Sequence, residues 1–218
     1  PPFTRRSVER IPFEWTPEEE ALAEALRNYR RTGNALVARL STKERSVGRF
    51  VFSLLTKRLL SCPYALARTW WAHVEGYEAA GTFDEAEAAR RRVESQTADD
   101  IEMAQREEDL ARTGAAWLRR HEGELRGARD AVSDALQILG WGREVIDEPI
   151  DPETVERGRS FPPDGKWNAL RVWLAQRLED LSVLDRVYPV VLFRLFRPVQ
   201  HPFVRTRHNG MQLRAAWY

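Results

Sequence analysis

Apolar residues recur every three or four positions over most of the first 140 residues, which is the spacing of one face of an α-helix. The strongest stripe covers 46–60, and a second covers 63–80. Pro63 must separate the two stripes, because a proline removes a helical hydrogen bond and restricts the residue before it. The pattern therefore predicts two amphipathic helices that pack against each other across a short break.

Local capping signals set the ends of the other predicted helices. Thr16 precedes Pro17 and stands three residues before Glu19, which is a helix-start signature, and Gly33-Asn34 is the predicted end of this helix. The periodic pattern returns over 117–139 until glycines stop it, and Asp164 is the predicted cap of a last helix.

These signals predict a mainly α fold, an irregular helical bundle or helical insert with a poorly ordered C-terminal tail. The segment 82–111 is rich in acids and poor in large aliphatic residues, so we expect it to be mobile and to make few core contacts. The proline-rich segment 141–163 is the predicted linker. The predicted organisation is an extended lead-in over 1–15, a helical domain over 16–140, the linker over 141–163, and a final region over 164–218.

The C-terminal end is unusual in composition. The segment 187–193 is the one strand-like apolar run, and Pro189 weakens it. From Arg186 to Tyr218 the chain holds six arginines and no acid. A cationic nucleic-acid-binding arm is one interpretation. The interpretation we favour is an end that does not belong to a folded domain.

Overall composition excludes several classes of protein. The 218 residues include 34 Lys and Arg against 33 Asp and Glu, so the net charge of +1 indicates neither an acidic nor a basic partner. Cys62 is the single cysteine, which excludes an internal disulfide and favours a reducing, cytoplasmic location. No apolar run is long enough to cross a membrane. Because the chain begins with Pro1 and not with methionine, we expect it to be part of a longer protein.

The sequence contains no complete catalytic or metal-binding pattern. Gly165-Lys166 lacks the glycine spacing and the hydroxyl residue of a phosphate-binding loop. The acidic run 84–87 follows no buried strand, so a solvated helix start is its expected role. The four histidines form no metal-ligand spacing, and Cys62 is an expected buried thiol. We therefore predict no catalytic, cofactor-binding or metal-binding residue.

One basic cluster carries a functional hypothesis. Over 43–58 the only acid is Glu44, and the residues that we predict to bind nucleic acid are Arg45, Arg49, Lys57 and Arg58. On a helical wheel Arg58 falls inside the apolar stripe. It either extends past the core in the last helical turn or reaches a phosphate backbone together with Lys57.

The segment from Gly48 to Thr69 reads GRFVFSLLTKRLLSCPYALART. It resembles a segment that follows the first RecA-like motor domain in large bacterial Swi/Snf-type helicases, including those of the DISARM phage-defence system. Cys62 stands where that family has the second of two serines. The triplet Asp164-Gly165-Lys166 resembles the start of the second motor domain of these helicases.

The resemblance implies a non-catalytic helical fragment of an ATP-dependent Swi/Snf-type DNA helicase or translocase, placed between its two RecA-like domains. In such a parent ATP and Mg²⁺ are held by motifs outside this chain, so the chain alone is expected to be inactive. The implied partners are DNA and the flanking motor domains, with no membrane. The alternative hypothesis is a free-standing α-helical interaction module with no enzymatic parent.

Overall fold

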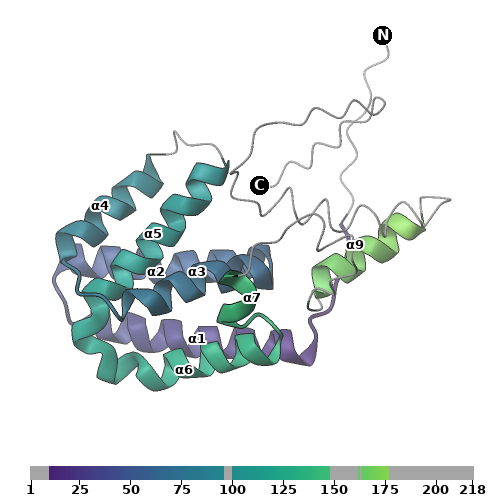
Figure 1. Cartoon of the computed structure of the whole chain (residues 1–218), viewed down its shortest axis with the longest axis horizontal. Coiled ribbons are helices and arrows are strands. Elements are labelled where there is room, and N and C mark those ends of the chain that lie inside the picture. The colour runs from purple at the N-terminus through teal and green to yellow at the C-terminus, as the bar shows by residue number, and fades with distance from the viewer. Residues whose placement is uncertain (1–9, 96–99, 148–161, 163, 177–218) are drawn as a thin grey trace, which may run out of the picture.

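The computed structural model describes residues 10–95, 100–147, 162 and 164–176, and every regular element among them is a helix (Figure 1). The predicted mainly α fold is confirmed for this part of the chain. The strand-like run 187–193 and the acid-free tail lie outside the described residues. The helices are α1 (Pro17–Val37), α2 (Thr42–Ser61), α3 (Pro63–Gly76), α4 (Phe83–Glu94), α5 (Asp100–Leu118), a 3-10 turn η1 (Arg119–His121), α6 (Glu122–Ile138), α7 (Arg143–Asp147) and α9 (Gly165–Ala175).

Helix α1 begins where the sequence predicts and ends later. The Thr16 side chain accepts a hydrogen bond from the Glu19 amide, and the Glu19 carboxylate accepts one from the Thr16 amide. The predicted end at Gly33-Asn34 is wrong, since α1 continues to Val37. Gly33 lies against the Phe52 ring of α2, where a Cβ atom would overlap the ring. This glycine therefore allows two helices to approach closely and does not end one.

The predicted break between α2 and α3 is confirmed. Helix α2 ends at Ser61, Cys62 is extended with φ −166° and ψ 161°, and α3 begins at Pro63. The Cys62 sulfur accepts a hydrogen bond of 3.3 Å from the Ala65 amide, so this thiol caps α3. Cys62 is buried, as expected, and burial raises the pKa of its thiol to about 12.

Helix α3 is the central element of the bundle. Eleven of its fourteen residues are buried, and α5, α2, α7 and α6 all pack against it, α5 most extensively. Figure 1 shows α3 enclosed among these helices, and α9 projecting beyond the end of the bundle at which α1 begins. At Gly76 the two backbones come so close that a Cβ atom would overlap the carbonyl oxygen of Arg112. Small residues on both helices make this packing possible.

The prediction that 82–111 makes few core contacts is wrong. Ala86, Ala89 and Val93 of α4 are buried, as are Leu110 and Ala111 of α5. Their side chains are small, but the helices lie close enough together for small side chains to fill the interface. The segment therefore forms one wall of the bundle.

The helical domain also extends past its predicted boundary at residue 140. Trp141 is buried, and its carbonyl oxygen accepts a hydrogen bond of 2.9 Å from the indole of Trp71. Gly140 turns the chain with a φ of +89°, a conformation that favours glycine, and α7 follows. Residues 141–147 thus belong to the domain and not to the predicted linker, of which 148–161 and 163 lie outside the described residues.

A chain of hydrogen bonds crosses the core. The His73 Nδ1 atom lies 2.9 Å from the Ala111 carbonyl oxygen, which can only accept, so Nδ1 carries the proton of a neutral ring. The free Nε2 then accepts from the Tyr29 hydroxyl at 2.6 Å, and that hydroxyl accepts from Tyr77 at 2.8 Å. The network joins α1, α3 and α5, and it satisfies every buried polar group within it.

Replacing Gly76 by alanine tests the close approach of α3 and α5. The added methyl group meets a backbone carbonyl that cannot move aside, so we expect the Gly76→Ala variant to lose about 2 kcal/mol of unfolding free energy in urea titrations. Gly127 is the matched control, because nothing lies within 4 Å of a Cβ atom there and alanine favours helix by about 1 kcal/mol. Equal effects in both variants would argue against the close approach.

The pH dependence of stability tests the buried histidine. Burial lowers the pKa of His73 from 6.5 to about 4. Between these values the unfolded chain takes up a proton that the native chain does not, so stability must fall as the pH falls from 6.5 towards 4. The slope contributed is at most about 1.4 kcal/mol per pH unit. In the His73→Gln variant this slope between pH 6.5 and 5 should disappear, and an unchanged slope would contradict the assignment.

Candidate nucleic-acid interface

Helix α2 carries all four residues predicted to bind nucleic acid, but it does not present them together. Arg45 and Arg49 lie in its first half, whereas Lys57 and Arg58 lie near its end. Thirteen positions at 1.5 Å each separate the first from the last by about 20 Å along the helix. The structure thus divides the predicted cluster into two pairs.

Arg58 points into the bundle, towards α5. Its guanidinium lies 2.7 Å from the Glu107 carboxylate, and Lys57 lies 2.9 Å from the other oxygen of that carboxylate. The side chain of Glu107 is only 4% exposed and that of Arg58 is 18% exposed. Arg58 falls on the apolar face of the wheel because its partner is a buried carboxylate of another helix. The internal ion pair accounts for this placement without a phosphate.

A second ion pair extends this contact between helices. Arg68 of α3 lies 3.0 Å from the carboxylate of Glu108, the residue that follows Glu107 in α5. Two consecutive acids of α5 therefore bind cations of α2 and α3. These two acids belong to the segment that was expected to be mobile, and they serve here as partners between helices.

Arg45 and Arg49, in the first half of α2, differ in their exposure. Arg49 is exposed, and Arg45 is half-buried and donates a 3.3 Å hydrogen bond to the Leu40 carbonyl. Neither has an acidic partner among the residues that the structure describes. Glu44, the one acid of α2, faces Ser41 and Arg120, and these contacts lower its pKa. This half of α2 therefore retains its positive charge.

Sequence reasoning missed Arg30 of α1. The contacts of Gly33 with Phe52 and of Gly48 with Val37 set the antiparallel register of α1 and α2. The same register places Arg30, one turn before Gly33, beside the half of α2 that follows Phe52. Arg30 is exposed, and it too lacks an acidic partner within the described part of the chain. The sequence signal was a long acid-poor stretch, which a search confined to 43–58 does not reveal.

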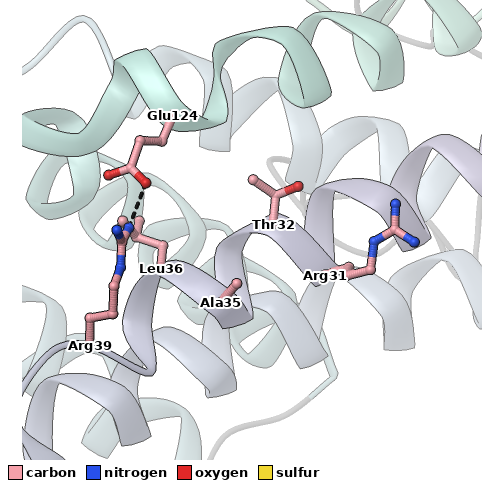
Figure 2. A pocket seen from close by; sticks show the side chains of 6 residues that line it. All are labelled: Arg31, Thr32, Ala35, Leu36, Arg39 and Glu124. Carbon is pink, nitrogen blue, oxygen red and sulfur yellow. Dashed lines mark hydrogen bonds and ion pairs between the residues drawn. The ribbon is translucent and has the colours of Figure 1, made fainter.

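A shallow hollow lies on the other side of α1, between α1 and α6. Figure 2 shows its lining, in which the side chains of Arg39 and Glu124 point towards each other and form an ion pair, while Arg31 points away from them. The two opposite charges neutralise each other, so the hollow presents no strong field for a ligand. It is not the candidate interface.

The described residues do not fit a nucleotide or a metal ion. The Gly165 amide donates to the Glu19 carboxylate at 3.1 Å, and Lys166 donates to the carbonyls of Leu60 and Ser61, so neither is available to a phosphate. No group of three or more potential metal ligands occurs within the described ranges. The acidic run after Thr82 is an exposed, capped start of α4, as predicted.

No known protein family, curated protein or solved structure matches the chain in the comparisons made. Among the described helices, none combines the length and apolar character needed to span a membrane. The assignment of function therefore depends on the geometry of the chain itself and on the resemblance of 48–69.

Replacing Glu107 by glutamine tests the internal role of Arg58. The change leaves a largely buried guanidinium without its counter-charge, so we expect a loss of about 2 kcal/mol of unfolding free energy. The control is Glu24→Gln, which breaks an exposed pair with Arg27 and should cost about 0.5 kcal/mol or less. Urea denaturation measures both. A cost for Glu107→Gln no larger than that of the control would show that the pair does not stabilise the fold.

Proposed function

We propose that the chain is the helical module of an ATP-dependent Swi/Snf-type DNA helicase or translocase, inserted between two RecA-like motor domains and without catalytic groups of its own. Phage defence is the biological setting that the resemblance favours. The observation that carries the proposal is that the chain before α1 and the start of α9, on either side of the helical domain in the sequence, lie side by side.

Glu19 holds these two ends together. Its buried carboxylate accepts a hydrogen bond of 2.8 Å from the Thr16 amide, where the domain begins, and one of 3.1 Å from the Gly165 amide, where α9 begins. Gly165 lies so close to the Glu14 carbonyl that a Cβ atom would come within 2.6 Å of it. Residues about 150 positions apart are thus in direct contact.

Adjacent ends are what a domain inserted into another domain needs. Such an insertion leaves the host chain nearly continuous, because the host enters and leaves the module at one place. The resembling segment 48–69 forms α2, the Pro63 break and most of α3, which are the centre of this module. Geometry and resemblance therefore support the same proposal.

The parent protein provides the test. We expect its complete reading frame to encode a phosphate-binding loop and an acidic box before this chain and a second motor domain after it. In the purified parent, a short Gly-Ser linker in place of 15–164 should keep basal ATP hydrolysis and reduce its stimulation by DNA at least tenfold. The isolated chain should hydrolyse no ATP, because ATP hydrolysis needs a phosphate-binding loop and a bound Mg²⁺ ion, and the motifs that hold these belong to the motor domains of the proposed parent.

Two results would overturn the proposal. One is a complete reading frame without motor motifs, which would favour a free-standing helical interaction module. The other is ATP hydrolysis that co-purifies with the isolated chain and is lost on its denaturation.

A further inference from the structure

Positive charge is concentrated in one third of the helical domain. Between Ala25 and Val74 the sequence contains ten Lys and Arg residues and a single acid, Glu44. The chain as a whole has a net charge of only +1, so this stretch is offset by acids elsewhere. The stretch forms most of α1, α2 and α3.

Acids outside this stretch neutralise half of these cations. Each of these five lies within 4 Å of a carboxylate: Arg27 with Glu24, Arg39 with Glu124, Lys57 and Arg58 with Glu107, and Arg68 with Glu108. The other five have no acidic partner among the described residues: Arg30, Arg31, Lys43, Arg45 and Arg49. All five belong to α1 or to the first half of α2.

The uncompensated cations share a surface with hydroxyl groups. One stripe along α2, made of residues at three-and-four spacing, is exposed to solvent: Thr42, Ser46, Arg49, Ser53 and Lys57. Glu44 is turned away from this face, towards Arg120 of η1. Arg30 of α1 lies at the Ser53 end of the face, through the register set by Gly33 and Phe52. We call this surface, defined by Arg30, Arg45, Ser46, Arg49 and Ser53, the α1–α2 basic face.

We propose that the α1–α2 basic face binds the sugar-phosphate backbone of a nucleic acid, without reading its sequence. Arginine and serine side chains are frequent donors to phosphate oxygens. The face carries no exposed aromatic ring for stacking on bases, among the residues that define it. The choice of DNA as the nucleic acid rests on the proposed function. The inference adds the surface of this chain that contacts the DNA.

Arg58 has no part in this interface. It is bound to a buried carboxylate on the inner side of α2. Lys57 lies at the edge of the face with a side chain that is 71% exposed, but it shares Glu107 with Arg58. Binding is therefore assigned to Arg30, Arg45 and Arg49, a set that differs from the one predicted from the sequence.

Fluorescence anisotropy of labelled DNA with the full 218-residue chain tests the proposal. Two unrelated duplex sequences and one single strand are titrated at several salt concentrations, using the natural chain and the Arg30→Gln/Arg49→Gln variant. We expect the variant to weaken binding to both duplexes equally, and to lower the slope of log affinity against log salt by about 0.9 for each lost duplex contact. On the single strand the expected change is about 0.7 per contact.

Arg91→Gln/Arg92→Gln is the matched control, because it removes two exposed arginines from α4 and lowers the net charge equally. It should leave the affinity within twofold of the natural chain and its salt slope unchanged. All three proteins are compared by thermal unfolding, and the three Tm values should agree, because both pairs of arginines are exposed.

Several outcomes would overturn the proposal. These are no DNA binding by the natural chain at low salt, equal losses in the two variants, or a loss confined to one duplex sequence. Vesicles containing phosphatidylserine serve as a second probe. If the natural chain binds these vesicles and the Arg30→Gln/Arg49→Gln variant binds DNA as tightly as the natural chain does, the face is a membrane contact and the proposal is wrong. Each of these results concerns only the basic face, since the reading frame of the parent decides the proposed function independently.

Discussion

The close approach of α3 and α5 is the constraint on which the rest of the bundle depends. At Gly76 the backbone of α3 lies against the carbonyl oxygen of Arg112, and Ala115 fills the space beside it. This proximity allows His73 to donate to the Ala111 carbonyl in the same interface. It also brings Glu107 and Glu108 of α5 within reach of cations on α2 and α3. A bulkier contact would separate these partners, and the buried His73 and Glu107 would lose the groups that offset the cost of their burial.

Features decided by a few neighbouring residues were predictable from the sequence. The capping box at Thr16, the break at Pro63 and the Asp164 cap of α9 all depend on side chains within three positions of the backbone groups that they affect. The end of α1 and the burial of 82–111 were not predictable in this way. Glycine is common at helix ends, so Gly33 looked like the end of α1. The residue that it packs against, Phe52, is nineteen positions away in the sequence. The alanines of α4 and α5 become core residues only because the helices approach closely enough to bury them.

The same distinction divides the candidate interface. The helical wheel correctly placed Arg58 on the inner side of α2, but its partner Glu107 is 49 positions further along the chain and belongs to a run that has the composition of a solvated face. Charge counting over a short window found Arg45 and Arg49 and missed Arg30, because Arg30 reaches the Ser53 end of this α2 surface only when α1 and α2 pack together. A charged residue on an apolar stripe predicts that a buried residue of opposite charge lies beside it. The sequence alone does not show which residue that is.

The start of α9 is hydrogen-bonded to the same two helices that form the α1–α2 basic face. Lys166 donates to the Leu60 and Ser61 carbonyls at the end of α2, and the Gly165 amide donates to Glu19 near the start of α1. The two helices that form the basic face therefore both hold the first turn of α9. An α-helix bends little, so a movement of one end displaces the other end as well, and α2 is about 30 Å long. For a nucleic acid bound on the basic face, a change in the direction of α9 would require these hydrogen bonds to break or the whole α1–α2 pair to move with it. The contact at Glu19 thus couples the outgoing chain to the surface on which we place the phosphate backbone.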